Sequence, residues 1–156
     1  MSDLTFLRQA IRLAKEHSLA GEGGPFGAVV VLEEKVVGQG WNRVVEDRDP
    51  TAHAEVLAIR DAARRLGTHL LADCAIYCSC EPCPMCLAAI YWARIPKVVF
   101  AGGEEDARAA GFDDGLIAHE LSLGWEERAL ESRQLTREEG KAVLEEWVQD
   151  PDRRRY

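Results

Sequence analysis

The sequence predicts an α/β fold in which helices cover both faces of a partly parallel sheet. Short Val-rich stretches, typical of strands, alternate with longer stretches in which apolar residues recur at helical spacing. Gly and Pro separate these stretches and mark where each one ends. The order strand, helix, strand, helix, strand requires crossover connections, which make neighbouring strands parallel and place helices against the sheet.

The first half of the predicted sheet is a β-hairpin that follows a helix. The helix is expected over residues 3–19, where an apolar stripe recurs at helical spacing and Asp3 is placed as the N-cap. A Gly-rich loop is expected at 21–27. Residues 26–32 and 36–41 are rich in Val and flank a Glu-Glu-Lys turn, so they predict two antiparallel strands.

A second helix and a buried strand come next. Residues 42–50 are polar and end in Pro, which is typical of a loop. The helix is expected over 52–66, with Thr51 as its N-cap and Gly67 ending it. A short apolar stretch at 74–79 predicts a buried strand.

The last predicted crossover is a helix over 83–93, with Pro on either side of its first residue, followed by a strand over 97–101. The pattern weakens after Gly102, where a helical turn and then a loop are expected. A final helix is predicted over 136–149, opening with TREE as an approximate capping box.

Length, composition and charge limit the class of protein. The 156 residues are 47% hydrophobic, which suits one domain with a core. No run of about 18 apolar residues is present, and charges interrupt the N-terminal apolar positions, so we expect a cytoplasmic protein without a membrane helix or signal peptide. The net charge of -8 argues against nucleic-acid binding. The run Arg153–Arg155 is interpreted as a solvated tail, with a phosphate contact as the alternative.

The five cysteines lie in one short window. Their odd number and the absence of a secretory signal argue against a disulfide framework and favour metal binding or reactive thiols. Cys74, Cys78 and Cys80 alternate with other residues along one face of the predicted strand, so we interpret them as packing residues.

Cys83 and Cys86 predict a zinc site. They are three apart at a helix start, which puts both sulfurs on one face, and the helix N-terminus favours their thiolates. His53 also lies at a helix start after a strand, so the three side chains converge if both helices begin at the same sheet edge. Three protein ligands leave one position for water, which is typical of catalytic zinc. Glu55, close to the metal without binding it, would then transfer protons.

Other interpretations stay open at this point. Taken alone, His53 could be a capping or core residue, and Glu55 could be a solvated charge on the helix surface. The Cys83–Cys86 pair could be a redox pair or two buried apolar residues. A closed structural site with Cys80 as fourth ligand is the metal-binding alternative, and it would suit a noncatalytic zinc module that binds a partner.

His53-Ala54-Glu55 and Pro82-Cys83-Pro84-Met85-Cys86 together match the H-x-E…P-C-x-x-C signature of zinc nucleobase deaminases. Through them the chain resembles the cytidine-deaminase-like superfamily. The stretches GGPFGAVV, DPTAHAEVLAIR, SCEPCPMCLAAIYWAR and GFDD are most similar to bacterial guanine deaminases. The resemblance implies a three-layer α/β/α sandwich with a mixed central sheet. It also implies one Zn²⁺ per subunit and hydrolysis of a free base, guanine, to xanthine and ammonia.

The resemblance further implies a single deaminase domain over 1–156 that forms a homodimer, with the segment of about 136–156 exchanged between subunits. Glu55 and Asp114 would be the catalytic residues. The residues implied to contact the purine are Phe26, Asn42, Ala54, Trp92, Asp114 and Tyr156. Without the resemblance, Phe26 and Trp92 would be interpreted as core residues and Asn42 as the cap of a turn. Asp114 would belong to a solvated turn, and Tyr156 to a disordered chain end.

Two alternative activities share the same zinc motif. A tRNA adenosine deaminase would need to grip phosphates, which the Arg153–Arg155 run favours weakly and the acidic charge and the GFDD motif disfavour. Deaminases of other small amino-heterocycles, such as cytosine, guanosine or a triazine, remain as the second alternative.

Overall fold

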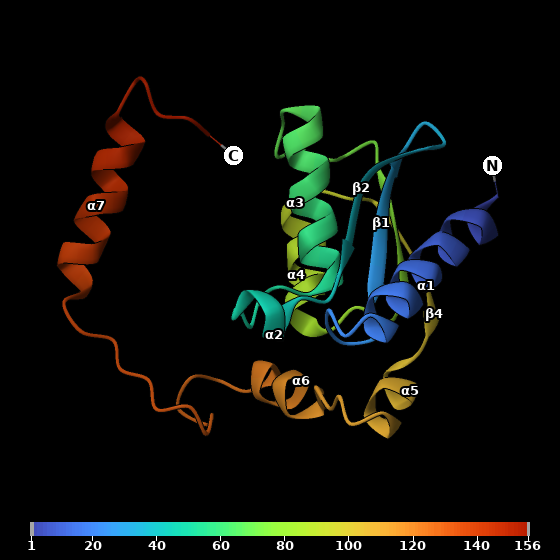
Figure 1. The fold of residues 1–156 in the computed structure, drawn as a ribbon. Helices are drawn as coiled ribbons and strands as arrows, with labels where there is room; N and C mark the ends of the chain where they lie inside the picture. The colour runs from blue at the N-terminus through green and yellow to red at the C-terminus, as the bar shows by residue number, and fades with distance from the viewer. Residues whose placement is uncertain (1, 156) are drawn as a thin grey trace. The chain divides into compact units, whose positions relative to one another are not determined.

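A mixed four-stranded sheet in the order β2-β1-β3-β4 forms the centre of the first 115 residues (Figure 1). The strands of this computed structural model, which describes residues 2–155, are β1 (Gly27–Leu32), β2 (Lys35–Trp41), β3 (Ala75–Cys80) and β4 (Lys97–Gly102). β1 pairs antiparallel with both β2 and β3, whereas β3 and β4 are parallel. The partly parallel sheet expected from the sequence is therefore confirmed.

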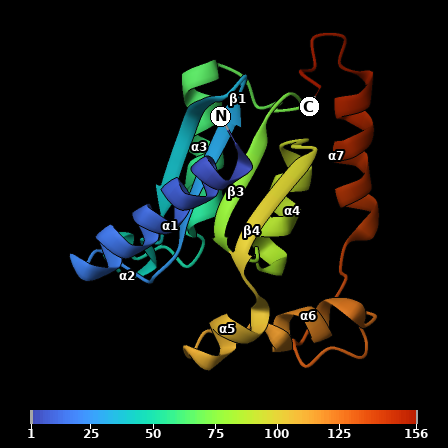
Figure 2. The same ribbon diagram turned by 90° about the vertical axis from the view of Figure 1, so that its right-hand side faces the viewer.

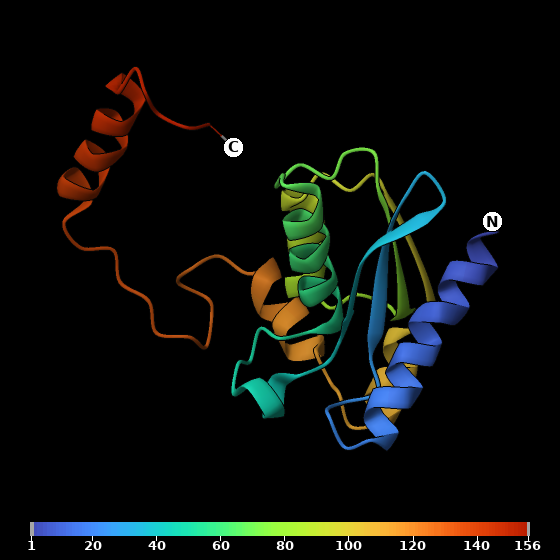
Figure 3. The same cartoon turned by 45° about the horizontal axis from the view of Figure 1, so that its top comes forward.

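Helices cover both faces of this sheet, as predicted (Figures 1 and 2). α1 (Asp3–Leu19) packs on one face, where Phe6 and Leu13 meet Val29 of β1. α3 (Ala54–Leu66) and α4 (Pro84–Trp92) pack on the other face, against Ala28 and Val30. Successive residues of β1 point to opposite faces, so all of them are buried except the last. Figure 3 shows the sheet between the two helical layers.

Two glycines of β2 fix the position of α3. A Cβ atom at Gly38 would lie 2.4 Å from the Ala58 carbonyl oxygen, and one at Gly40 would lie 2.3 Å from that of Ala54. Only glycine leaves room for the helix backbone at these distances. Because Ala54 is the first residue of α3, this contact places the start of the helix against β2.

Both N-terminal caps predicted for the first two long helices are wrong. Ser2 is the N-cap of α1, and the carboxylate of Asp3 instead accepts hydrogen bonds from the Tyr77 hydroxyl (2.7 Å) and from the Lys97 ammonium (2.8 Å). α3 begins after His53 rather than after Thr51. The Thr51 hydroxyl donates to the Asp49 carboxylate (2.6 Å), so it is engaged in the preceding turn.

Two short helices were not expected, and the start of the last helix differs from the prediction. α2 (Val44–Asp47) interrupts the predicted loop, and α6 (Gly115–Ser122) follows α5 (Glu104–Ala109) where no helix was expected. α7 (Arg137–Gln149) is confirmed, but Thr136 has a left-handed φ of 49° and makes no side-chain cap, so the predicted capping box is wrong. None of the helices in residues 2–155 combines the length and apolar character needed to cross a bilayer.

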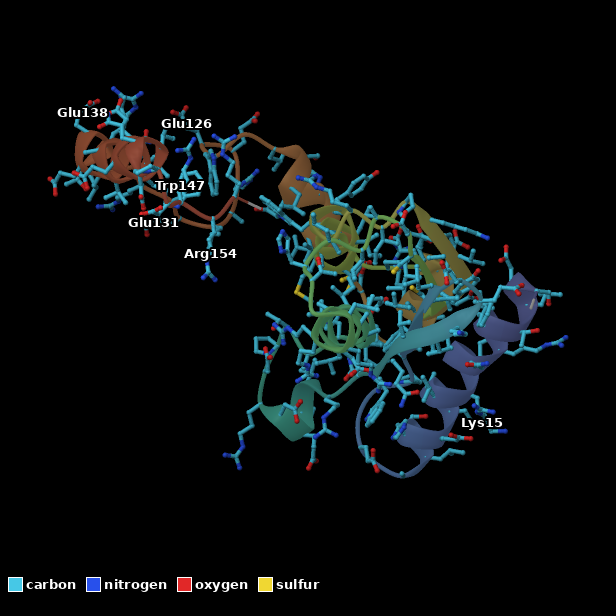
Figure 4. All side chains as sticks on the ribbon, turned by 90° about the horizontal axis from the view of Figure 1, so that it is seen from above. Lys15, Glu126, Glu131, Glu138, Trp147 and Arg154 are labelled. Atoms are coloured by element: carbon cyan, nitrogen blue, oxygen red, sulfur yellow. The ribbon has the colours of Figure 1, made fainter. Side chains whose placement is uncertain are left out.

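The chain divides into two units between Gly115 and Leu116. Within residues 116–155 no residue is buried, so this part of the chain has no core of its own. Its last helix, α7, carries Trp147 (Figure 4). The Arg153 guanidinium lies 5.7 Å from the centre of that indole ring. The exposed apolar side chains of α7 recur at helical spacing: Val143, Leu144, Trp147 and Val148.

Candidate active site

His53 lies just outside its helix, and this explains its two-residue spacing from Glu55. It is the N-cap of α3, with extended backbone angles (φ -74°, ψ 153°), whereas Glu55 belongs to the first helical turn. Helical spacing would turn the two side chains apart only if both residues were helical. In the structure both approach Cys86. Its Sγ lies 3.5 Å from His53 Nδ1 and 3.4 Å from the Glu55 Oε2.

Cys83 occupies the equivalent position on the next helix. It is the N-cap of α4, Pro84 is the first helical residue, and Cys86 lies in the first turn. The Cys83 Sγ lies 3.6 Å from His53 Nδ1. His53, Cys83 and Cys86 each offer one ligand atom, and these atoms all lie within 4.8 Å of one another. The two helix starts therefore meet, as the zinc hypothesis requires.

The geometry of this group fits tetrahedral zinc. With Zn–S bonds of about 2.3 Å and a Zn–N bond of about 2.05 Å, a tetrahedral angle separates nitrogen from sulfur by about 3.6 Å. The two measured separations from His53 Nδ1 are 3.6 and 3.5 Å. One nitrogen and two sulfurs are also ligands that zinc favours.

Hydrogen bonding and burial shift the pKa values of the two thiols in opposite directions. A hydrogen bond with Cys86, and to a smaller extent one with His53, stabilises the Cys83 thiolate. Together they lower the pKa of Cys83 to about 4. The same contact with Cys83, together with burial, raises the pKa of Cys86. The Cys86 thiol has one hydrogen to donate, and it lies against both the Cys83 sulfur and the Glu55 carboxyl group, 3.4 Å from Oε2. Contact with Cys83 raises the pKa of His53.

Glu55 is the one charged side chain in the buried polar set of the described residues, with 6% of its surface exposed. Burial raises the pKa of this carboxyl group, because the charged form loses hydration. A carboxyl group with a raised pKa holds its proton more readily than an exposed one, which suits a general acid–base residue. A solvated helix charge, the alternative interpretation of Glu55, is thus wrong.

Cys80 stays outside the metal-ligand group. Its thiol donates to the Gly103 carbonyl oxygen at 3.5 Å. Cys74, Ile76 and Cys78 belong to the core cluster beneath α3 and α4, which confirms the packing interpretation for Cys74 and Cys78, whereas the half-buried Cys80 lies outside that cluster. Burial raises the pKa of Cys78, so its thiol stays protonated.

Phe26 and Asn42 are brought together at the start of β1. The Asn42 backbone N–H donates to the Phe26 carbonyl oxygen at 3.0 Å. The Asn42 Oδ1 accepts from the backbone N–H groups of Gly24 and Val44, each at 3.3 Å. Asn42 thus caps the turn with its oxygen, and these donors direct its Nδ2 atom away from the turn. Phe26 precedes the strand and packs only partly against the core.

The GFDD segment contacts Phe26 through a residue that the sequence analysis assigned no role. The rings of Phe112 and Phe26 lie edge to face, with centroids 4.8 Å apart and planes at 86°. Asp114, two residues further along, is half-buried. Asp113 accepts a hydrogen bond from the Gly115 N–H at 2.9 Å and pairs with Arg108 at 3.5 Å, so it stabilises the turn.

The remaining predicted contacts differ in what they can offer a ligand. The Ala54 side chain is fully buried, so only its backbone is available. Trp92 ends α4 and is 66% exposed, which makes the core interpretation wrong. The helix separates it from Cys83 by about 14 Å. Tyr156 lies outside the described residues.

Comparison with known proteins places this site in a family. Residues 1–102 match the family described as the cytidine and deoxycytidylate deaminase zinc-binding region. The guanine deaminase of Bacillus subtilis is 47% identical over 156 residues, which is 100% of both chains. Its crystal structure superimposes with a TM-score of 0.97 and covers 100% of this chain and 99% of that one.

Two further relatives cover less of the chain. The tRNA-specific adenosine deaminase of Aquifex aeolicus is also 47% identical, but over 96 residues, which is 62% of this chain and 63% of the relative. A solved guanine deaminase from Nitrosomonas europaea is 36% identical, with a TM-score of 0.66, covering 70% of this chain and 64% of that one. The zinc-binding family and the His–Cys–Cys group confirm the zinc prediction.

Proposed function

Because this chain belongs to the cytidine and deoxycytidylate deaminase zinc-binding family, we propose that it deaminates guanine to xanthine and ammonia. The observation that carries the proposal is the full-length likeness to the Bacillus guanine deaminase. The match to the Aquifex tRNA-specific enzyme covers less than two thirds of the chain. The shared zinc motif therefore defines the chemistry, and agreement along the whole chain favours the free base as substrate.

In the proposed mechanism Glu55 carries protons between water and the base. His53, Cys83 and Cys86 would hold the zinc, one per subunit, and when bound it supplies an activated water molecule. Glu55 accepts a proton from the water that adds to C2 of guanine and delivers it to the ring nitrogen next to C2. The second water proton ends on the amino group, whose bond to C2 breaks as ammonia leaves.

Residues around the metal group would recognise the purine. We assign base stacking to Phe26, hydrogen bonding through Nδ2 to Asn42, and backbone contacts at the start of α3 to Ala54. Asp114 would contact the purine and serve as a second proton carrier for the departing ammonia. The half-buried position of Asp114 beside the Phe26–Phe112 contact supports this assignment.

The substrate proposal is tested by ammonia release from the purified, zinc-loaded protein. Guanine, guanosine, adenine, cytosine and a tRNA anticodon stem-loop bearing adenosine would be compared under the same conditions. We expect ammonia from guanine alone. Release from the stem-loop but not from guanine would replace the substrate proposal with the tRNA alternative.

We propose that the protein is a homodimer that uses the outer face of α4. This helix carries no charged residue, yet Leu87, Tyr91 and Trp92 are exposed on the side away from the sheet. A helix that is apolar all round is normally buried. Trp92 would then contact the partner, and its predicted place in a pocket wall would depend on that interface.

Placing a charge on the α4 face should weaken this dimer. Leu87→Asp and Tyr91→Asp should each shift the protein toward the monomer in light scattering coupled to size-exclusion chromatography, because a buried unpaired carboxylate is costly. Leu19→Asp, at the exposed end of α1 on the other face of the sheet, is the control and should leave the mass unchanged. If the protein without substitutions proved to be a monomer, the dimer proposal would be contradicted.

We also propose that the segment of about 136–156 is exchanged between subunits and that its last residue, Tyr156, closes the partner's site. The apolar stripe of α7 has no core of its own within residues 116–155, which supports an exchange. Each chain would then form a single deaminase domain over 1–156, and each active site would contain residues from both subunits.

Exchange predicts that two inactive variants rescue each other. A chain ending at residue 135 lacks the segment, and Glu55→Gln lacks the proton carrier, so each alone should be inactive. Co-expressed, they should regain up to roughly one quarter of the activity, since half of random dimers are mixed and each mixed dimer has one intact site. Absence of rescue in a dimer shown to be mixed would contradict exchange.

The five cysteines are all free among the described residues. Zinc binding through Cys83 and Cys86 requires thiolates, which a reducing compartment preserves. We therefore propose a cytoplasmic location.

A further inference from the structure

We infer that Phe112 is a positioning residue that holds the ring of Phe26 in the orientation needed for stacking on the purine. The inference rests on the proposed function, because it takes Phe26 as the stacking residue. The two rings lie edge to face, with centroids 4.8 Å apart and planes at 86°. This arrangement brings the positive edge of one ring to the negative face of the other and so favours one ring orientation.

The backbone of Phe26 is fixed, but its side chain needs another support. Its N–H donates to the Gly24 carbonyl oxygen at 2.8 Å, and its own carbonyl oxygen accepts from Asn42 at 3.0 Å. These bonds fix the main chain and leave the torsions of the side chain undetermined. Packing restrains the ring only in part, because Phe26 is half-buried. Phe112 supplies a further restraint through its ring contact with Phe26.

Phe112 is itself held from both sides. Its N–H donates to the Ala107 carbonyl oxygen at 3.0 Å, after a left-handed turn at Gly111 with φ of 92°. On its other side Asp113 pairs with Arg108, whose guanidinium also binds Glu104. Phe112 therefore belongs to a turn that is held by hydrogen bonds and an ion pair, and the same turn carries Asp114. The contact links two segments that we assign to purine recognition.

The exposure of Phe112 distinguishes a role in positioning Phe26 from a role in packing the core. Phe112 is 43% exposed, whereas residues of the core clusters are at most 8% exposed. Replacing it should therefore disturb the site more than the fold. An aromatic pair of this kind corresponds to a change of about 2- to 12-fold in binding. The loss should appear in KM for guanine, because stacking acts on the bound base and not on proton transfer.

The test compares three substitutions of exposed phenylalanines. Phe112→Leu keeps an apolar side chain but removes the ring edge, Phe112→Tyr keeps the edge, and Phe100→Leu is the matched control, because Phe100 is 46% exposed. We expect Phe112→Leu to raise KM about 2- to 12-fold with kcat within about twofold, and the other two variants to stay near the unchanged protein.

A second readout does not depend on turnover. The chain has only four phenylalanines, so 4-fluorophenylalanine labelling gives a simple fluorine NMR spectrum in which Phe26 can be assigned by substitution. Phe112→Leu should shift and broaden the Phe26 resonance, and Phe100→Leu should leave it in place. An unchanged Phe26 resonance together with an unchanged KM would overturn the inference. If the protein without substitutions were inactive on guanine, the proposed function would be refuted instead. The fluorine spectrum would still decide whether Phe112 orders the ring of Phe26.

Discussion

Glu55→Gln should bind zinc as well as the unchanged protein and release ammonia from guanine roughly 10²- to 10⁴-fold more slowly. Gln has nearly the same shape as Glu and can still contact the Cys86 sulfur, so the site should stay assembled. It cannot accept a proton from water or deliver one to the base. The measurement is kcat beside zinc content, with Glu105→Gln, an exposed carboxylate of α5, as the matched control.

The same variant should respond differently to pH when the metal is removed. Burial raises the pKa of Glu55 in the folded protein above its unfolded value. Between these two values the folded chain holds more protons than the unfolded chain, so the free energy of unfolding decreases as pH rises. Gln does not ionise, so metal-free Glu55→Gln should be more stable than the metal-free parent at pH 8. Below the unfolded pKa of about 4.3 both side chains are neutral and the difference should vanish.

Two outcomes would contradict the result expected for Glu55→Gln. Substantial retained turnover by a zinc-loaded Glu55→Gln would show that another group carries the proton, with Asp114 the first to examine. Loss of zinc from the variant would show that Glu55 supports the metal and would leave the kinetic result without meaning for proton transfer. The Glu105→Gln control separates both outcomes from a general effect of removing a negative charge.

Elements with a strong local pattern could be predicted, because their periodicity depends only on neighbouring residues. The second long helix was expected to end at Leu66, where α3 ends in the structure. The start of that helix was less predictable, since Thr51 and His53 can both act as an N-cap. The hydrogen bond of Thr51 to Asp49 engages it in the preceding turn, and the helix begins after His53.

Contacts between distant segments required the structure. The approach of His53 to Cys83 depends on two helices that begin at the same sheet edge, and the position of α3 depends on its close packing against Gly38 and Gly40. The sequence motif identified the ligand residues but not the N-cap positions that aim them at one point. The Phe26–Phe112 pair gave no local signal, because each aromatic residue alone suits a core position.

His53→Ala, Cys83→Ser and Cys86→Ser should each lose both zinc and deaminase activity, whereas Cys80→Ser should keep both. The three side chains form the one group placed for a metal ion within the described part of the chain. Changes in residues that only support a ligand already weaken zinc binding by about 10- to 100-fold, so removal of a ligand should weaken it by more than about 100-fold. Serine is no substitute, because its hydroxyl stays protonated where a thiolate is needed.

Zinc affinity would be measured by competition with a chromophoric chelator, and zinc content by elemental mass spectrometry on the same samples. Thermal unfolding with and without zinc adds an independent readout. Zinc at 100 times its dissociation constant stabilises a folded protein by about 2.7 kcal/mol, and the ligand variants should lose that increment. Cys80→Ser is the matched control because Cys80 is a half-buried thiol near the site that bonds to the Gly103 carbonyl instead.

The cysteine variants decide between an open and a closed zinc site. A closed structural site needs four protein ligands, and in this chain Cys80 was the candidate for the fourth. If Cys80→Ser lost zinc, no position would remain for water, and Glu55 would have no proton to transfer. If instead zinc stayed bound with full activity, the metal would have three protein ligands and one site for exchange. Only that arrangement joins the buried carboxyl group of Glu55 to the chemistry of the metal.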